Sequence, residues 1–521
     1  MLKSKIMTLL LVLTCLLSIP FQALADTAST APKPKSVLML YDSLAIGTPQ
    51  EGNIEALQRL FAGFSVSVTV MSLEAYHQGD INGFDQAVLV RNKVDEIQKL
   101  PADLVRDWNG FQGSLLQVGG GLTDRMRQAL HIQDKRLDQD YASIRIDQLQ
   151  EDLIPVNGIS YLTSYEGQAY GSLTSEKLNL KAPYGVRNGM FAYIPYMTKG
   201  NLTEWSAAYV LRDWLGVKTA SHAYVMMEGI YPFSNLELVN QMADRLYDAG
   251  IPFIAGVQPT FGNWDYPAMQ RYMEALKHIQ ARNGSIVVQT PIVDSTSPPA
   301  ALKLPNEMSS FLNQLGSSGI APVGIATEMY WSYDKQYTAD ALSFFDSGIV
   351  LPNKKAWYRE KTNTSSTFTS AVYTISEKEL AAYGSSQAAR DPLPINTALV
   401  YTFTDDAAAL SKLLDAITST WTTFADYKNE VHTVHTPSNV FSSQSGHLAI
   451  NGTGVHLNDQ VQDVDSAHVY VQEGPQSLTT LFSVQNNILI VLIVATLLLF
   501  GIFIIIGHRL YKRKYEQPWR S

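Results

Sequence analysis

Six polar and aromatic residues fall where predicted strands end, and these are the positions at which the chain could do chemistry. The set comprises Glu228, Gln289, Asp294, Glu328, Tyr330 and Trp331. Aromatic rings beside hydrogen-bonding groups are typical of a groove that holds a sugar chain without cleaving it. A carboxylate pair, Glu228 with Asp294 or Glu328, could instead provide a general acid and base. In a third interpretation the six residues line a pocket that has lost its function, and their polar groups form hydrogen bonds with one another.

Alternating strand and helix patterns should bring these residues to one face of a barrel. From residue 221, short apolar runs alternate with stretches of helical spacing. The predicted strands are residues 222–227, 252–257, 285–289, 322–326, 348–351 and 397–403. Six or seven strand–helix units favour a closed or nearly closed parallel barrel, in which chemistry gathers where strands end and loops begin.

Three strings near the first two barrel strands carry a family pattern. They are YVMMEGIYPF at residues 224–233, LYDAGIPF at 246–253 and VQP at 257–259. This pattern resembles a branch of the polysaccharide deacetylase-like superfamily of distorted (β/α) barrels, which includes many membrane-anchored bacterial proteins. The resemblance implies metal-dependent removal of acetyl groups from a polymer. A divalent metal such as zinc would be held by one aspartate and two histidines, with a second carboxylate as base.

The positions that would hold this metal carry other residues. Gly229 stands beside Glu228 where the resemblance places a ligand carboxylate, and residues 288–294 (VQTPIVD) lack the paired histidines. Histidine is also missing from residues 327–331 (TEMYW) and 403–405 (FTD), which correspond to later histidine positions of the family. The resemblance therefore implies a deacetylase-like barrel whose metal site is degenerate.

The histidines of the barrel region do not repair this loss. Between residues 221 and 430 there are two, His222 at the start of a predicted strand and His278 within a predicted helix. Because catalytic zinc usually needs three protein ligands, we expect neither a catalytic residue nor a cofactor. A divalent metal would be required only if the barrel is an active deacetylase or other carbohydrate-active hydrolase with non-standard ligands.

An aspartate pair and a histidine pair have the composition of functional motifs, but their positions in the chain do not favour a function. Asp405 and Asp406 follow a late strand and precede an alanine-rich stretch, so we expect them to cap a helix. His432 and His435 are three residues apart, a spacing that places them on opposite faces of a strand and does not favour a shared metal.

Residues 36–205 predict an open α/β domain of flavodoxin- or amidotransferase-like type. Strand patterns at residues 36–41, 86–90 and 114–118 alternate with helical ones, as in a parallel sheet covered by helices. The domain also looks like the extra domain that precedes the barrel in some relatives. Gly119–Gly121 follows a strand, but it lacks the spacing of a nucleotide fingerprint. We therefore interpret this glycine run as a tight turn rather than a phosphate cradle.

The two ends of the chain predict export and a membrane anchor. A basic start, an apolar run and the string ALA before Asp26 indicate a signal peptide. Residues 488–507 are free of charge and long enough to cross a bilayer, and basic residues follow them. The predicted segments are a signal peptide at 1–25, a linker at 26–35, the α/β domain at 36–205, the barrel at 206–430, a β-rich stalk at 431–485, a transmembrane helix at 486–507 and a cytoplasmic tail at 508–521.

The amino-acid composition argues against further classes of protein. Of 521 residues, 46% are hydrophobic and 17% charged, with a net charge of −9. This acidic balance makes nucleic acid an unlikely partner, and the one cysteine, Cys15, excludes a disulfide framework. We expect an α/β protein, an open α/β domain followed by a distorted (β/α) deacetylase-like barrel, with one C-terminal transmembrane helix.

The function predicted from these features is the binding or guiding of a cell-surface polysaccharide or exopolysaccharide, beside a membrane polysaccharide synthase complex. The protein would be anchored in the cell membrane by a single pass, with most of the chain extracytoplasmic and its C-terminus cytoplasmic. An active hydrolase and a protein-binding structural ectodomain remain the alternatives.

Overall fold

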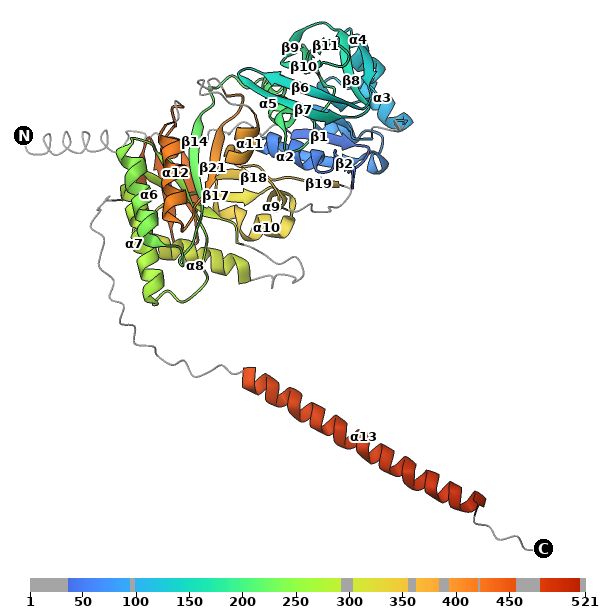
Figure 1. The fold of residues 1–521 in the computed structure, drawn as a ribbon, viewed down its shortest axis with the longest axis vertical. Helices are drawn as coiled ribbons and strands as arrows, with labels where there is room; N and C mark the ends of the chain where they lie inside the picture. The colour runs from blue at the N-terminus through green and yellow to red at the C-terminus, as the bar shows by residue number, and fades with distance from the viewer. Residues whose placement is uncertain are drawn as a thin grey trace, which may run out of the picture. The chain divides into compact units, whose positions relative to one another are not determined.

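The computed structural model places the chain in two compact units, Met1–Asp463 and Val464–Ser521. The residues that it describes are 36–93, 99–291, 303–354, 362–383, 393–419, 422–455 and 478–515. Within the first unit, a sheet built mainly from the N-terminal segments is followed by a barrel (Figure 1).

An eight-stranded sheet forms the N-terminal part of the first unit, in the order β19-β2-β1-β3-β4-β13-β12-β9. Strands β1 to β4 and β13 are parallel, whereas β9, β12 and β19 pair antiparallel. The bounds are β1 Ser36–Tyr41, β2 Ser67–Ser72, β3 Gln86–Arg91, β4 Ser114–Gly119, β9 Gln168–Tyr170, β12 Gly185–Asn188, β13 Phe191–Ile194 and β19 Thr362–Thr364.

Helices cover both faces of this sheet, which explains why its central strands are apolar throughout. On β1, Val37 and Met39 pack into one core cluster while Leu38 and Leu40 pack into another. The helices are α2 Asn53–Gly63, α3 Ala102–Gly110, α4 Asp124–Ala129 and α5 Leu202–Leu215, with single turns at Leu73–Ala75 and Asp80–Gly83.

Two small antiparallel sheets extend the domain between β4 and β13. One has the order β11-β10-β6-β7 and the other pairs β5 with β8. Their bounds are β5 Gln133–Leu137, β6 Asp140–Ile146, β7 Leu149–Val156, β8 Ile159–Ser164, β10 Ser172–Ser175 and β11 Leu180–Ala182. The α/β character expected for this region is confirmed.

A closed barrel of seven parallel strands follows, in the order β14-β15-β16-β17-β18-β20-β21. The last strand, β21, pairs with the first, β14, which closes the barrel (Figure 1). The strands are β14 Ala223–Ile230, β15 Phe253–Val257, β16 Gly284–Gln289, β17 Pro322–Glu328, β18 Ser347–Leu351, β20 Ser370–Ser376 and β21 Thr397–Thr402. The predicted parallel barrel is therefore confirmed, while its kinship to deacetylases stays a prediction.

Short and long helices connect the barrel strands. They are α6 Leu236–Asp248, α7 Pro267–Ala281, α8 Lys303–Ser317, α9 Tyr330–Tyr333, α10 Lys335–Asp340, α11 Glu377–Ala382 and α12 Ala407–Thr418, with a single turn at Leu342–Phe344. The strand β20 was not predicted, although its sequence, SAVYTIS, is rich in β-forming residues.

Helix α2 joins the N-terminal sheet to the barrel. The described part of the connection from β18 to β20 contains β19 and no helix, and α2 packs against both barrel strands. Every residue of α2 is buried, including Arg59. A side chain at Gly63 would place its Cβ 2.7 Å from Ile395 Cδ1 and 3.2 Å from Tyr373 Cβ, so glycine permits the close approach of helix and barrel.

The boundary predicted between residues 205 and 206 falls inside α5, which packs against α2 and against β12 and β13. In the other direction, β19 leaves the barrel region and pairs with β2 at the edge of the N-terminal sheet. The two regions therefore exchange elements.

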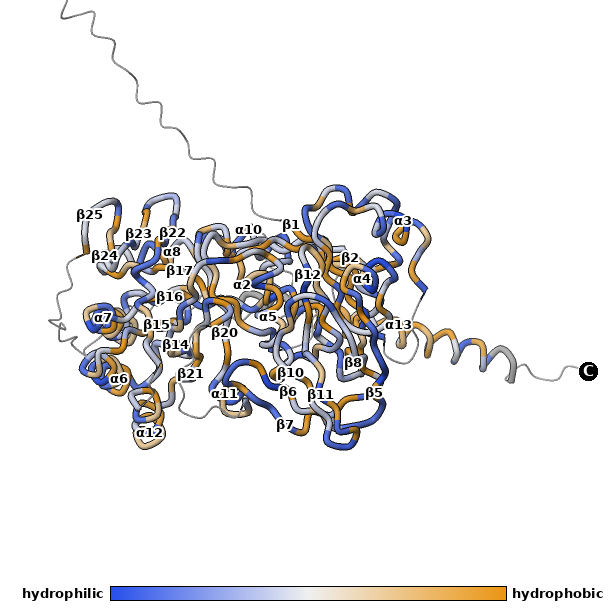
Figure 2. The backbone as a smooth tube through the Cα atoms, turned by 90° about the horizontal axis from the view of Figure 1, so that it is seen from above, coloured by the Kyte–Doolittle hydropathy of each residue, from blue (hydrophilic) through white to orange (hydrophobic). Residues whose placement is uncertain are grey.

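A four-stranded antiparallel sheet, β22-β23-β24-β25, packs on the barrel next to β17 and α8 (Figure 2). Its strands are His432–His435, Val440–Gln444, His447–Ile450 and Thr453–Gly454, and a single turn at Tyr427–Asn429 precedes them. Val434 forms an isolated bridge to Phe345, and the Thr436 hydroxyl donates to Asn313 Oδ1 at 2.7 Å. This part of the predicted stalk is thus folded against the barrel.

The second unit contains the helix α13, Leu478–Tyr515. Its segment Leu489–Lys512, 24 residues, is long and apolar enough to cross a membrane, judged by length and composition. The helix expected from the charge-free run is confirmed. The predicted signal peptide and linker lie outside the described residues.

Candidate functional site

Three of the predicted site residues lie at the carboxyl ends of barrel strands. Glu228 is near the end of β14, Gln289 ends β16 and Glu328 ends β17. Tyr330 and Trp331 follow in α9, directly after β17. Asp294 lies outside the described residues.

Glu228 and Gln289 belong to one hydrogen-bonded group. Gln289 Oε1 accepts from the Gly229 amide at 3.2 Å and from Gln258 Nε2 at 3.0 Å. Glu228 Oε1 accepts from the Thr402 hydroxyl at 3.3 Å. Four neighbouring strands, β21, β14, β15 and β16, thus contribute to a polar group at one end of the barrel.

The oxygen of the Gln289 side-chain amide accepts hydrogen bonds within the protein, whereas its nitrogen is available to donate to a ligand. It is 5% exposed, and its Nε2 donates to no residue in the described part of the chain. A Cβ at Gly256 would lie 3.3 Å from Gln289 Cδ and 2.8 Å from Met226 Cε, so this glycine leaves the room that the Gln289 side chain occupies. Gln258 belongs to the string VQP at residues 257–259, but neither it nor Gly256 was among the predicted site residues; their place at the end of β15 is the signal for both.

Gly229 occupies an irregular point of β14. The pairing of β14 with β15 shifts between Met227 and Ile230, and Gly229 has φ of +81°. A residue with a Cβ is disfavoured in this left-handed conformation. Glycine is therefore suited to the backbone at this position, where the resemblance would place a ligand carboxylate.

Glu328 and Tyr330 form a separate group on β17 and β18. Glu328 Oε2 accepts from the Lys354 amide at 3.0 Å, and the Tyr330 amide donates to Asn353 Oδ1 at 2.9 Å. Burial, reinforced by the nearby charge of Glu328, raises the pKa of Tyr330. No hydrogen bond between described residues links this group to Glu228.

Trp331 is not an exposed platform. Its side chain is 1% exposed, and its ring lies 4.5 Å from that of Tyr337 and 5.9 Å from that of Tyr330, centroid to centroid. The prediction that Trp331 presents its face to a sugar is corrected by this burial. The short α9 turns the indole toward α10, where apolar contact is favoured over exposure.

The exposed aromatic surface lies instead in the loop that follows β14. Phe233 is 82% exposed, and its ring stacks on that of Tyr231 at 4.9 Å with an interplanar angle of 17°. The Tyr231 amide donates to the Ser234 hydroxyl at 3.1 Å, and the Asn235 amide donates to Asp405 at 2.7 Å. These bonds hold the loop between β14 and α6. The string IYPF at residues 230–233 contained this signal.

The implied metal does not fit the residues at this end of the barrel. His222 precedes β14 at its amino end, where its amide donates to Asn396 Oδ1 at 2.9 Å. His278 is buried in α7, with Nε2 2.9 Å from Asp244 Oδ1. Among the described residues there is no group of three or more His, Cys, Asp or Glu side chains that could hold a metal ion.

Asp406 caps a helix, as its sequence position predicts. Its Oδ1 accepts from the amides of Ala408 at 2.8 Å and Ala409 at 2.9 Å at the start of α12. Asp405 binds the Asn235 amide instead of the helix. His432 and His435 also separate as expected, with His432 buried and His435 exposed.

Comparison with known proteins yields no family. No family model and no curated protein matches the chain. A glycoside hydrolase family 30 subfamily 8 xylanase from Clostridium acetobutylicum is similar in structure, with 11% identity over 43% of this chain and 80% of the xylanase and a TM-score of 0.25. A β-arabinopyranosidase shows 10% identity over 60% of each chain and a TM-score of 0.22. At such TM-scores the likeness is too slight to assign a function.

Proposed function

We propose that the protein binds a cell-surface polysaccharide at the carboxyl end of its barrel and does not cleave it. In this proposal the barrel is a deacetylase-like fold whose catalytic metal site has degenerated. The protein would hold or guide the polymer outside the membrane, next to a membrane polysaccharide synthase complex.

The observation that carries the proposal is the exposed Tyr231–Phe233 stack beside a polar group. A stacked aromatic pair with one ring 82% exposed offers an apolar face to a ligand. Sugar rings present C–H faces to such aromatic surfaces and hydroxyls to nearby amides and carboxylates. Glu228, on the strand before this loop, offers the carboxylate, and Gln289, which accepts from the Gly229 amide, offers the amide.

The few side chains that could act as metal ligands at this end of the barrel support sugar binding over metal-dependent hydrolysis. Gly229 occupies the position of the expected ligand carboxylate, and neither His222 nor His278 lies at this end of the barrel. Glu228, whose Oε1 accepts from the Thr402 hydroxyl, is a single carboxylate, whereas a catalytic zinc usually needs three protein ligands.

A binding assay on the full-length protein in detergent tests the proposal. Oligosaccharides of N-acetylglucosamine and of glucosamine, together with a broad glycan array, serve as probes. We expect at least one glycan to bind, and Phe233→Ala to weaken that binding about tenfold, the effect of losing one good aromatic contact. Tyr141→Ala is the matched control, because Tyr141 is a 62% exposed aromatic residue on β6. Equal binding by both variants would contradict the proposal.

An acetate-release assay on the same preparation separates the active-hydrolase alternative. The protein is supplied with Zn²⁺, Co²⁺ or Mn²⁺ and acetylated oligosaccharides, with Glu228→Gln as the comparison. Metal-dependent turnover that is lost in Glu228→Gln would establish a hydrolase and overturn the binding-only function. A complete lack of glycan binding and of turnover would favour the protein-binding ectodomain instead.

We also propose how the protein is arranged in the membrane, from the apolar segment of α13. The segment Leu489–Lys512 would cross the bilayer once, with residues before it extracytoplasmic and the tail cytoplasmic. The apolar side chains from Leu489 to Ile506 are mostly exposed in the second unit, as lipid contact requires.

A further inference from the structure

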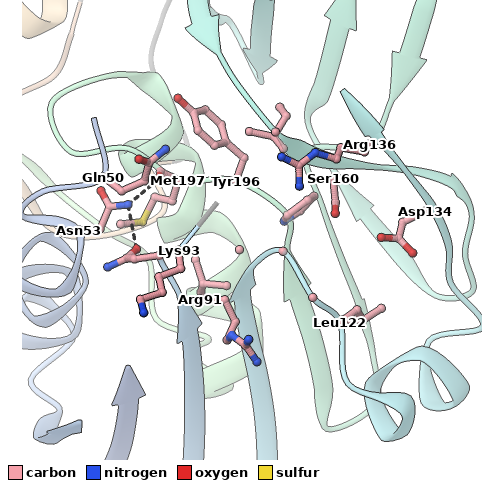
Figure 3. A pocket seen from close by; sticks show the side chains of 18 of the residues that line it. Gln50, Asn53, Arg91, Lys93, Leu122, Asp134, Arg136, Ser160, Tyr196 and Met197 are labelled. Carbon is pink, nitrogen blue, oxygen red and sulfur yellow. Dashed lines mark hydrogen bonds between the residues drawn. The ribbon is translucent and has the colours of Figure 1, made fainter. Parts of the chain in front are cut away.

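A second concave region lies at the carboxyl edge of the N-terminal sheet (Figure 3). Two cavities of about 260 Å³ and about 590 Å³ share the residues Gln50, Asn92, Lys93 and Tyr196. We call the two together the sheet-edge cleft. Their combined size is within the range of small-molecule sites, about 300–1,000 Å³.

The cleft lies where the strand order of the sheet reverses. The chain passes from β1 to β2 on one side and then returns to β3 on the other side of β1. At such a point the connections leave the strands in opposite directions and open a crevice at their carboxyl ends, the usual ligand position of open α/β sheets. The segments after β1, β3, β4 and β13 line this crevice.

A buried polar network holds the walls of the cleft in place. Asp42 pairs with Arg91 at 3.2 Å and accepts from the Asn92 amide at 2.8 Å. Asn53 Nδ2 donates to Asn92 Oδ1 at 3.3 Å and to the Met197 carbonyl at 2.8 Å. These residues come from four separate segments, so the loops after β1, β3 and β13 are tied to the start of α2. A site with such support is rigid before any ligand arrives.

Positive charge is concentrated along the smaller cavity. It is lined by five cationic residues and one carboxylate: Arg91, Lys93, Arg127, Lys135, Arg136 and Asp134. Arg127 pairs with Asp134 at 2.6 Å, Arg136 with Asp138 at 2.7 Å and Arg91 with the buried Asp42. The side chains of Lys93 and Lys135 make no ion pair or hydrogen bond with any described residue. In a chain of net charge −9, this local surplus favours an anionic ligand.

The glycine run after β4 adds backbone donors and open space. Gly119 has φ of +89° and a Cβ there would lie 2.2 Å from the Arg91 carbonyl oxygen, and Gly121 has φ of +63°. Gly120 has neither constraint, since the nearest atom to its Cβ would be Ser160 Oγ at 4.0 Å. The absence of a side chain at Gly120 therefore keeps the cavity open.

The backbone amides of this run are available to a ligand. Gln117 Nε2 donates to the carbonyl oxygens of Gly120 at 3.3 Å and Gly121 at 3.0 Å, which fixes the turn. The amides of Gly120 and Gly121 donate to no residue in the described stretches. Backbone N–H groups without a partner, lining the same cavity as two lysines, are well suited to an oxyanion.

We propose that the sheet-edge cleft binds a carbohydrate that carries an oxyanion, either a sugar phosphate or a uronate. Lys93, Lys135 and the amides of the glycine turn would hold the oxyanion. Gln50 and Ser160, which line the cleft, can bond sugar hydroxyls. This site is separate from the barrel end and does not depend on the function proposed for it.

Calorimetry on the full-length protein in detergent tests this site with glucose 1-phosphate, glucuronate, inorganic phosphate and neutral glucose. We expect glucose 1-phosphate or glucuronate to bind, and the tighter of the two identifies the oxyanion. Binding should weaken as salt is added. Failure of both acidic sugars to bind overturns the proposal, as does equally tight binding of glucose. Phosphate that binds as tightly as glucose 1-phosphate would overturn the carbohydrate part of the proposal.

Variants locate the site. Lys93→Ala combined with Lys135→Ala should weaken binding about tenfold or more, because charge-assisted hydrogen bonds are lost. Gly120→Leu should block binding by filling the cavity, with an unchanged melting temperature as the check on folding. Lys412→Ala on α12 is the matched control, an exposed lysine outside the cleft. Unchanged binding in both cleft variants would contradict the assignment, whereas Phe233→Ala should leave it unaffected.

Discussion

At the residue scale, one buried charged group determines how the sheet and the barrel meet. Arg59 on α2 contacts Glu204 on α5 at 2.8 Å and stacks over the Tyr373 ring of β20 at 4.0 Å. Burial alone would raise the pKa of Glu204, but the Arg59 charge and its hydrogen bonds lower it. Tyr373 donates to the same Glu204 oxygen at 2.8 Å. The group is therefore charged, paired and shared by three elements.

We expect Arg59→Met to lower the free energy of unfolding by about 3–5 kcal/mol, because Glu204 would be left as an unpaired buried carboxylate. Chemical denaturation of the full chain in detergent measures the loss. Arg145→Met on β6 is the control, an exposed arginine whose replacement should change stability by less than about 0.5 kcal/mol. Addition of Glu204→Leu to Arg59→Met should restore part of the loss. If Arg59→Met alone were as stable as the wild type, this explanation would be refuted.

At the element scale, local signals in the sequence specify where helices begin. Asp406 accepts two amide hydrogen bonds at the start of α12, and Asn201 and Asn235 cap α5 and α6 in the same way. These caps satisfy amides that have no partner within the helix. Such positions can be recognised without tertiary information, because the capping side chain acts within three residues of itself.

Replacement of this cap gives an element-scale prediction. Asp406→Ala should destabilise the protein by about 1 kcal/mol through loss of the bonds to Ala408 and Ala409. Lys412→Ala, within the same helix, should have almost no effect, since alanine is a good helix former. The melting temperatures of the two variants provide the measurement. An equal shift in both would show that the cap does not contribute.

The docking of β22 on the barrel depends on a neutral histidine. His432 is 1% exposed; its Nε2 lies 2.6 Å from the Tyr427 carbonyl oxygen and its Nδ1 2.7 Å from the Ser347 hydroxyl. Because a carbonyl only accepts, Nε2 carries the proton and Nδ1 accepts from Ser347. Burial lowers the pKa of His432.

This lowered pKa predicts a pH dependence. A base whose pKa is lower in the folded state is protonated first in the unfolded chain, so stability is full above about pH 6.5 and falls as the pH drops below it. We expect the free energy of unfolding to decline more between about pH 7.5 and about pH 5 in the wild type than in His432→Gln. Carboxylates contribute equally to both proteins, so the difference isolates His432. Parallel pH curves would contradict the prediction.

At the scale of the whole molecule, the chain is a folded unit of sheet and barrel followed by a separate apolar helix. The barrel closes through β14 and β21, and α2 covers β18 and β20 from the N-terminal sheet. Since α2, α5 and β19 all cross between the two regions, we expect neither to be stable when expressed alone. The second unit has no comparable core, because the side chains of Leu489–Lys512 that are described are largely exposed.

A chain that ends at Asp463 tests the role of the second unit. We expect it to lose membrane association while it keeps its fold, because the apolar segment Leu489–Lys512 is removed and the first unit is intact. Alkaline extraction of membranes followed by immunoblotting measures the partition, and circular dichroism checks the fold. Retention of the shortened chain in the membrane would show that another segment anchors it.

The sequence by itself determined the elements whose signals are local. The apolar runs of β1, β3 and β4, the repeated units of the barrel and the charge-free run of α13 each carry their own period or length. These patterns also placed Glu228, Gln289 and Glu328 at strand ends, since the end of an apolar run can be read directly. The absence of histidine at the expected positions was equally visible.

Only the tertiary structure decided which of these residues meet. It joined Gln289 to Gly229 and Gln258, gave Glu328 and Glu228 different hydrogen-bond partners, and buried Trp331 while leaving Phe233 exposed. It also buried the polar face of α2, and it gathered Lys93 and Lys135 around the glycine turn. Burial and proximity depend on contacts between segments that are distant in sequence, and periodicity within one segment contains no record of them.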